Sequence, residues 1–241
     1  MKIYKTENYD KMSEKVASLL AAQIISKPDS VLGLATGSTP EGTYDCLVDW
    51  YDRGLLDFSE VKTVNLDEYK GLAPEDHNSY RYFMDQHLFD RVNIDKNNTY
   101  VPDGLADDPQ KLCDDYEKLI DGLGGMDVQL LGMGHNGHIG FNEPGGEFPM
   151  ACHCVSLAPR TVEANKKYFA SEDVMPKQAY SMGIGTIMKA KKIFLVVSGE
   201  EKAETLGKVL HGPVTPEIPA SILKFHPDVT LIADAAALSK S

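Results

Sequence analysis

Apolar and polar residues alternate along this chain in blocks that predict helices and buried strands in turn. Between residues 9 and 26, apolar side chains recur at the three- and four-residue spacing of one helical face, with polar side chains on the other. Short runs rich in valine, leucine and isoleucine have the length and composition of strands buried on both faces. Such runs occur at residues 31–35, 61–66, 126–131, 179–184, 193–197 and 229–233.

Further helices are predicted between these strands. They begin at Glu41, at Asn78 and at Ser198, and cover residues 112–120 and 161–171. Strands that alternate with helices predict a doubly wound, mainly parallel, Rossmann-like α/β sheet flanked by helices.

The chain shows no sign of division into several domains. No Pro/Ser/Gly linker, block of charge or internal repeat interrupts the 241 residues, so we expect one domain, 1–241. Prolines and glycines between residues 144 and 159 predict a loop. Together with the helix predicted after it, this loop would form a lid at approximately residues 145–176.

The charge and the apolar segments of the chain limit the binding partners and the cellular location that we expect. The formal net charge of −12 argues against nucleic acid or an anionic membrane as a partner. The N-terminus lacks the apolar segment of a signal peptide, and no apolar run approaches the roughly 20 residues of a membrane span. We therefore expect a soluble, cytoplasmic protein in which any anionic ligand binds to a local cationic pocket.

The four cysteines are too few for a disulfide scaffold in a chain of this length. Cys152-His153-Cys154 contains metal-binding residue types. Structural zinc sites normally use wider spacing and a second pair of ligands, so a zinc site is the weaker interpretation.

A first candidate site follows the strand predicted at 31–35. There Thr36, Gly37, Ser38 and Thr39 precede a proline and a predicted helix. Backbone N–H groups and hydroxyls at a helix start suit a phosphate, whereas the alternative is an ordinary cap in which the hydroxyls serve the helix itself. The segment is neither a Walker loop nor a G-x-G-x-x-G turn, which argues against a nucleotide.

Two other strand ends carry groups suited to acid–base chemistry. Asp67 and Glu68 follow the strand at 61–66 and are candidates for proton abstraction; the alternative is that Asp67 caps a turn. The strand at 126–131 leads into a glycine-rich loop, where His138 can titrate near neutral pH and Glu143 can orient it. A metal site at His135, His138 and Glu143 is less favoured, because a glycine-rich loop holds ligands poorly and no HExxH helix is present.

Lys202 lies in the first turn of the helix predicted after the strand at 193–197. A cation at the start of a helix interacts unfavourably with the helix dipole, and an anion bound beside it would offset this cost. Nucleophilic catalysis is not favoured, since no G-x-S-x-G segment occurs and no cysteine lies in an activating setting. The four strand ends together predict a small phosphorylated ligand that undergoes proton transfer.

Four segments stand out in order along the chain: LGLATGSTP at 32–40, NLDEY at 65–69, HNSY at 77–80 and GMGHNGHIGFNEP at 132–144. Together they closely resemble the glucosamine-6-phosphate deaminase family. The related 6-phosphogluconolactonases share the fold and a looser glycine-rich loop.

The resemblance implies conversion of glucosamine 6-phosphate to fructose 6-phosphate and ammonia without a cofactor or a metal. It implies that His138 opens the sugar ring, supported by Glu143 and Asn136. It also implies that Asp67 moves a proton from C2 to C1 through an enolamine. Many family members have Asp at the position of Asn136, and an amide cannot hold an imidazolium by charge.

For the phosphate, the resemblance implies the 36–39 loop, Lys202 and a basic residue on the helix after the predicted lid loop. The family often has Arg at that last position, whereas this chain offers Lys167, with Lys166 and Arg160 as alternatives. A lysine supplies a point charge instead of a bidentate fork. Glu68 and His135 are secondary candidates.

Two further expectations concern assembly and competing functions. Larger family members are allosteric hexamers with a longer C-terminus, so we expect a short-form enzyme that is monomeric or weakly associated. The competing hypotheses are a 6-phosphogluconolactonase-like hydrolase and a sugar-phosphate sensor that binds without turnover. A sensor of this kind normally carries a DNA-binding segment, and neither a spare helical module nor a basic face is evident in the sequence.

Overall fold

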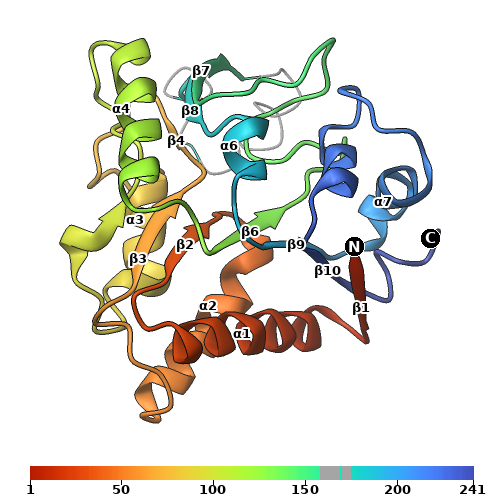
Figure 1. Ribbon diagram of the computed structural model, residues 1–241, viewed down its shortest axis with the longest axis horizontal. Coiled ribbons are helices and arrows are strands. Elements are labelled where there is room, and N and C mark those ends of the chain that lie inside the picture. The colour runs from red at the N-terminus through yellow and green to blue at the C-terminus, as the bar shows by residue number, and fades with distance from the viewer. Residues whose placement is uncertain (158–168, 170–174) are drawn as a thin grey trace.

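A seven-stranded sheet forms the centre of the computed structural model, which describes residues 1–157, 169 and 175–241 (Figure 1). All of its strand pairs are parallel, and the spatial order is β1-β10-β9-β6-β2-β3-β5. The predicted α/β architecture is therefore confirmed. The strands are β1 (Lys2–Thr6), β2 (Val31–Leu34), β3 (Lys62–Asn65), β5 (Thr99–Tyr100), β6 (Val128–Gly132), β9 (Ile193–Val197) and β10 (Val229–Asp234).

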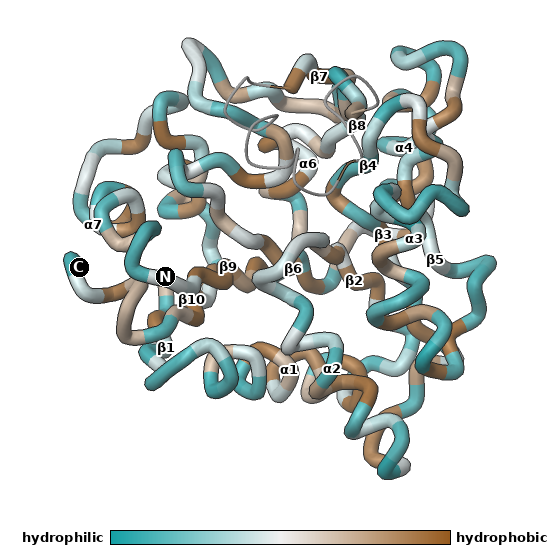
Figure 2. The backbone as a smooth tube through the Cα atoms, turned by 180° about the vertical axis from the view of Figure 1, so that it is seen from behind, coloured by the Kyte–Doolittle hydropathy of each residue, from teal (hydrophilic) through white to brown (hydrophobic). Residues whose placement is uncertain are grey.

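Helices cover both faces of the sheet. On one face, α1 (Tyr9–Ser26) and α2 (Ser38–Asp52) pack on alternate side chains of the central strands; α4 (Pro109–Gly122), α6 (Ile184–Met188) and α7 (Ala203–His211) cover the other (Figure 1). Two separate apolar cores result, one on each side. Figure 2 shows the apolar colour concentrated along the central strands, as expected for strands buried on both faces.

A second, antiparallel sheet lies beside α4, with β7 and β8 above α6 in the view of Figure 1. It contains β4 (Asp67–Tyr69), β8 (Gln178–Ser181) and β7 (His153–Ser156), in that order across the sheet. The prediction that 179–184 belongs to the parallel sheet is wrong, because β8 pairs with β4 and β7 instead. The interval predicted as loop between 144 and 159 also contains a strand, β7.

Some element boundaries also differ from the prediction. β1 and β5 were not predicted, since β1 is an edge strand with exposed polar positions and β5 has only two residues. The helix predicted from 112 begins at Pro109, where the Asp108 side chain accepts hydrogen bonds from two backbone N–H groups. The helix predicted from Asn78 is α3 (Tyr80–Met84) followed by a π-helical turn (Asp85–Phe89).

Two findings bear on the remaining predictions. The helix expected at 161–171 lies outside the described residues, apart from the isolated position 169. None of the helices in the described part of the chain is long and apolar enough to cross a membrane.

The strand order places a crevice at the middle of the sheet. From β2 the chain continues outward through β3 and β5, whereas β6, β9 and β10 extend in the opposite direction. In open α/β sheets the loops leave such a reversal point on opposite sides, so that a crevice forms beyond the carboxyl ends of the strands. β9, β6, β2 and β3 are adjacent here, and the four candidate segments follow these four strands.

Asp127 connects the amino-terminal ends of the central strands through ion pairs and a backbone hydrogen bond. Its carboxylate has 5% of its side-chain surface exposed and lies 2.6 Å from Lys27 Nζ and 2.8 Å from Lys191 Nζ. It also accepts a hydrogen bond of 2.9 Å from the backbone N–H of Val31. Burial opposes ionisation of Asp127, but the two lysines and this N–H outweigh it and lower the pKa of the carboxyl group.

We predict that Asp127→Ala lowers the free energy of unfolding by about 2–3 kcal/mol, because it leaves a buried N–H and two cations without their shared acceptor. Chemical denaturation at neutral pH measures this change. Since the folded-state pKa is depressed, the contribution is present above the unfolded pKa of about 3.9 and disappears as the pH falls through the folded value. Asp121→Ala, at an exposed ion pair with Lys189, is the matched control and should change stability by less than about 0.5 kcal/mol.

Candidate active site

A cavity of about 530 Å³ opens at the carboxyl ends of the central strands. Its wall includes residues from each of the four segments singled out in the sequence: the loop after β2, the strand after β3, the loop after β6 and the turn after β9. These segments are up to about 170 residues apart in the chain, and the parallel sheet brings them together. The candidate residues that line the cavity are Thr36, Gly37, Ser38, Thr39, Asp67, His135, Asn136, His138 and Lys202.

The loop after β2 forms one end of the cavity. Gly37 has φ +88° and ψ 179°, a conformation that suits glycine, and helix α2 begins at the next residue. The helix thus starts at Ser38, earlier than the predicted Glu41. Its first N–H groups and the hydroxyls of Ser38 and Thr39 lie at the cavity wall, and no side chain caps the helix at Gly37. This arrangement suits an anion better than an ordinary cap does.

Lys202 provides a cation to the same cavity. It lies in a 3-10 turn (Glu200–Lys202) between β9 and α7. Burial lowers the pKa of Lys202, while Glu201 and Asp234 act in the opposite direction. No carboxylate oxygen of the described residues lies within 4.0 Å of Lys202 Nζ, so the ammonium group is available to an anionic ligand.

The loop after β6 holds a group of three polar side chains, linked by a His–carboxylate contact and hydrogen bonds. His138 Nδ1 lies 3.1 Å from Glu143 Oε1, and Asn136 Nδ2 donates a hydrogen bond of 2.7 Å to Glu143 Oε2. Asn136 Oδ1 in turn accepts a hydrogen bond of 3.2 Å from the backbone N–H of His138. Asn136 therefore holds Glu143 in place, and an ionised carboxylate at position 136 could not donate this bond.

The His138 ring packs directly on the loop backbone. A Cβ added to Gly134 would lie 2.2 Å from Cε1 and Nε2 of His138, which shows that a larger residue at 134 would displace the ring. With Nδ1 at Glu143, the Nε2 edge remains for proton exchange with a ligand, as in other oriented histidines.

Asp67 is a buried carboxylate on the cavity wall, with 7% of its surface exposed. Burial, and secondarily the charge of Glu68, raises the pKa of Asp67 to about 8. A carboxyl group with a pKa near the working pH can both remove and return a proton. This geometry favours proton transfer over the alternative of a turn cap.

The backbone at Gly140 brings the His138 loop against Asp67. Gly140 has φ +57°, and a Cβ there would lie 3.5 Å from Asp67 Oδ2 and 3.0 Å from Ser181 Oγ. Phe141, the next residue, donates its N–H to Ser181 Oγ at 3.0 Å. The loop that carries His138 therefore lies against Asp67, and both side chains line the same cavity.

Of the two secondary candidates, only His135 lies at the cavity. Glu68 does not line the cavity; its carboxylate accepts backbone hydrogen bonds on the opposite side of β4. His135 lies at the cavity wall with 52% of its side chain exposed, and its Nε2 is 3.9 Å from Glu201 Oε1. The predicted phosphate ligands Lys167, Lys166 and Arg160 lie outside the described residues.

Aromatic side chains form much of the remaining wall, and the sequence did not identify them. Aromatic side chains on a helix that covers a sheet usually pack in the core, and Phe89 does so, whereas Tyr80 and Phe83 are only partly buried. Those two residues line the cavity, as do His77 and His87. Only the position of this helix immediately after the Asp67 strand could have suggested that role. Tyr69, Phe141 and Phe169 complete the aromatic part of the wall.

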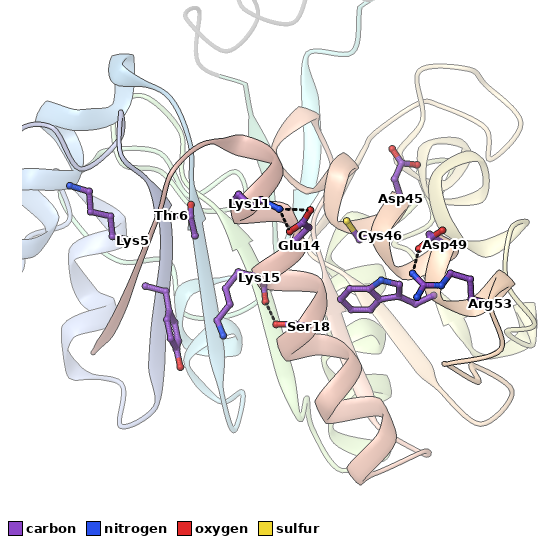
Figure 3. A pocket seen from close by; sticks show the side chains of 12 residues that line it. Lys5, Thr6, Lys11, Glu14, Lys15, Ser18, Asp45, Cys46, Asp49 and Arg53 are labelled. Carbon is purple, nitrogen blue, oxygen red and sulfur yellow. Dashed lines mark hydrogen bonds and ion pairs between the residues drawn. The ribbon is translucent and has the colours of Figure 1, made fainter.

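A second hollow, between β1, α1 and α2, has no comparable chemistry (Figure 3). It is broad and open, and it lies outside the crevice at the carboxyl ends of the strands. Several of its charged side chains already form ion pairs, such as Lys11 with Glu14 at 2.8 Å and Arg53 with Asp49 at 3.0 Å. We therefore consider the 530 Å³ cavity to be the candidate active site.

The Cys152-His153-Cys154 segment enters β7 in the second sheet. Among the residues that the structure describes, no group of three or more His, Cys, Asp or Glu side chains is placed to hold a metal ion.

Fold and cavity together define a class of protein: a parallel α/β protein with an anion-binding loop and acid–base groups at its switch point. A family model described as glucosamine-6-phosphate isomerases/6-phosphogluconolactonase matches residues 4–232. The chain belongs to this family.

Similar proteins of known sequence cover almost the whole chain. A glucosamine-6-phosphate deaminase of Lachnoclostridium phytofermentans is 52% identical over 232 residues, which is 96% of this chain and 98% of that protein. A glucosamine-6-phosphate deaminase of Clostridioides difficile is 51% identical over 240 residues, covering 100% of this chain and 96% of that protein.

Solved structures agree with the fold. A monomeric glucosamine-6-phosphate deaminase matches with a TM-score of 0.97 and 46% identity over 100% of both chains. A 6-phosphogluconolactonase from Trypanosoma cruzi matches with a TM-score of 0.78 and 20% identity, covering 99% of this chain and 96% of that chain. The latter similarity concerns the fold alone.

We predict that Asp67→Asn stabilises the protein relative to the wild type as the pH rises. The native carboxyl group has a pKa of about 8, whereas the unfolded group has about 3.9. Between these values the native state binds more protons at Asp67, so the wild type loses more stability than the variant as the pH increases; the buried Glu68 contributes to the pH dependence of both proteins. Urea unfolding of both proteins at several pH values from about 4 to 9 measures the difference; parallel stability curves would contradict the raised pKa.

Proposed function

We propose that this protein is a glucosamine-6-phosphate deaminase, which converts glucosamine 6-phosphate and water to fructose 6-phosphate and ammonia. The observation that carries the proposal is the convergence of Asp67 and the His138–Glu143 pair on one cavity with an anion-binding loop at its wall. Relatives that are about half identical over the full chain have this name.

In the proposed complex the phosphate binds to the loop from Thr36 to Thr39 and to Lys202. The available N–H groups at the start of α2, the hydroxyls and the ammonium group support this assignment. Lys167 stays our prediction for a further phosphate ligand, with Lys166 and Arg160 as alternatives.

The first chemical step opens the sugar ring. His138 takes the proton from the C1 hydroxyl and returns one to the ring oxygen, giving the free aldehyde. Glu143 orients the imidazole and stabilises its protonated form, and Asn136 holds Glu143. General acid–base catalysis of this kind typically contributes about 10²–10⁴ in rate.

The second step moves a proton from C2 to C1. Asp67, ionised, removes the C2 proton of the aldehyde while the substrate's ammonium group gives a proton to O1, which produces a neutral enolamine. Asp67 then delivers its proton to C1, which leaves a protonated ketimine at C2. Water adds to the ketimine, and the carbinolamine expels ammonia to leave fructose 6-phosphate. The steps use only side chains of this chain and water.

Two alternatives remain distinct hypotheses. The 6-phosphogluconolactonases among the solved structures share the fold at about 20% identity. A sensor that binds the sugar phosphate without turnover would use the same cavity. Neither accounts for a buried Asp67 that lines the same cavity as the His138 imidazole as directly as proton transfer does.

We predict that the protein releases ammonia from glucosamine 6-phosphate and leaves 6-phosphogluconolactone unhydrolysed above the spontaneous rate. Both reactions are measured at equal enzyme concentration. Faster lactone hydrolysis than ammonia release would favour the lactonase, and binding without any turnover would favour the sensor.

We predict that His138→Gln lowers kcat for the ring-closed substrate by about 10²–10³, since it removes the proton carrier for ring opening. The loss should be smaller when the assay is limited to substrate molecules that are already ring-opened, as a pre-steady-state burst would show. An equal loss for both forms of the substrate would contradict a ring-opening role.

We also propose that the protein is monomeric or weakly associated and lacks hexamer-based allosteric control, as the monomeric structural neighbour suggests. Sedimentation equilibrium should give the single-chain mass of 26.5 kDa. A stable hexamer, or sigmoidal kinetics relieved by N-acetylglucosamine 6-phosphate, would contradict this expectation. The cytoplasmic location stays a prediction from the sequence.

A further inference from the structure

Glu68 is almost completely buried, with 2% of its surface exposed, yet it does not line the cavity. Side chains of successive strand residues point to opposite faces, so Asp67 and Tyr69 reach the cavity while Glu68 points away. On that other side Glu68 borders a separate hollow together with Arg81 and Asp85. It is therefore not placed to contact a ligand in the cavity.

The Glu68 carboxylate instead accepts three backbone hydrogen bonds. Oε1 accepts from the N–H of Tyr69 at 2.8 Å and from that of Tyr80 at 2.9 Å; Oε2 accepts from the N–H of Arg81 at 2.9 Å. The last two donors are the first N–H groups of α3, which have no partner within the helix. Glu68 thus fastens the start of α3 to the strand that carries Asp67.

The first residue of α3 contacts both halves of the site. The Tyr80 ring lies parallel to the Phe141 ring, at 6.2 Å between centroids and 8° between planes. It also packs on Tyr69, with the centroids 4.8 Å apart. Phe141 belongs to the loop of His138, and Tyr69 is two residues after Asp67. Tyr80 therefore contacts both the His138 loop and the Asp67 strand, so a shift of its ring would disturb both segments.

We propose that Glu68 is a positioning residue for the proton-transfer step: by fixing the first turn of α3, it holds the Tyr80 ring against Phe141 and Tyr69 and keeps Asp67 in an apolar environment. This inference rests on the proposed deaminase function. Glu68 acts through Tyr80 and does not exchange protons with the substrate.

The ionisable neighbours of both carboxylates define what a test must separate. The ionisable groups near Asp67 are Glu68, Tyr80 and Tyr116. Those near Glu68 are Asp67, Tyr80 and Asp76. Burial raises the pKa of Glu68 to about 7, although its three backbone donors act in the opposite direction. Removing the charge of Glu68 would therefore also change the pKa of Asp67. The test needs a variant that loses this charge but keeps the shape of the side chain.

The test compares Glu68→Gln with Glu68→Ala in the full-length protein. The glutamine removes the charge but retains an acceptor for the N–H groups of Tyr69 and Tyr80, whereas alanine removes every acceptor. We expect kcat/KM for ammonia release to fall about 10- to 100-fold in Glu68→Ala and only slightly in Glu68→Gln. The acidic limb of the pH profile should move further toward low pH in Glu68→Ala, because Asp67 becomes hydrated.

A double-mutant cycle with Tyr80→Ala identifies the route of the effect. If Glu68 acts through Tyr80, Glu68→Ala should change kcat/KM by less than about threefold when Tyr80 is already alanine. Full additivity of the two substitutions would overturn the proposal. So would equal activity losses in Glu68→Gln and Glu68→Ala, because a charge effect alone would then explain them.

Asp108→Ala is the matched control for loss of a carboxylate that caps a helix. Asp108 accepts hydrogen bonds from the N–H groups of Gln110 and Lys111 at the start of α4, at an exposed position away from the cavity. It should lower thermal stability without changing the pH profile. If Glu68→Ala does not fold, the comparison of Glu68→Gln with the wild type and with Tyr80→Ala still decides: Glu68→Gln should keep kcat/KM close to the wild-type value, and a loss as large as that of Tyr80→Ala would contradict the proposal. A wild-type protein that releases no ammonia would contradict the proposed function instead.

Discussion

The carboxyl ends of four adjacent parallel strands open at the same edge of the sheet, and this constraint decides where every candidate group lies. β9, β6, β2 and β3 are neighbours at the point where the strand order reverses. Each therefore delivers the segment after it to one crevice, although the segments are distant in the sequence. Apolar cores on both faces of the sheet fix these strands in place, so short loops are enough to reach a common ligand.

Within this crevice, the burial that suits Asp67 and Lys202 to their proposed roles also lowers the stability of the folded protein. Asp67 is buried beside another carboxylate, and Lys202 is partly buried without a carboxylate within 4.0 Å among the described residues. Both ionised groups would be more stable in water. A bound sugar phosphate would give Lys202 a partner, and the dry surroundings of Asp67 bring its pKa to about 8, in the range where a carboxyl group exchanges protons with a substrate.

Much of this arrangement could be predicted from the sequence because its signals are local. The apolar runs predict five of the central strands, and the glycine, hydroxyl and histidine positions after them predict the candidate groups. The second sheet could not be predicted in the same way, since β4, β7 and β8 have three or four residues each and depend on pairing between distant segments. The roles of Glu68 and Tyr80 were missed for the same reason: adjacent residues in NLDEY point to opposite sides of β4, and only the tertiary structure shows which side faces the cavity.

The central claim is that Asp67 transfers the proton at C2, and exchange of that proton with solvent tests it most directly. The measurement follows deuterium incorporation at C2 of glucosamine 6-phosphate in heavy water, for the wild type and for Asp67→Asn, with substrate affinity determined in parallel. We predict that the variant binds the substrate with affinity close to that of the wild type and shows no exchange above the spontaneous rate. Continued exchange in Asp67→Asn, or a loss confined to affinity, would contradict the account.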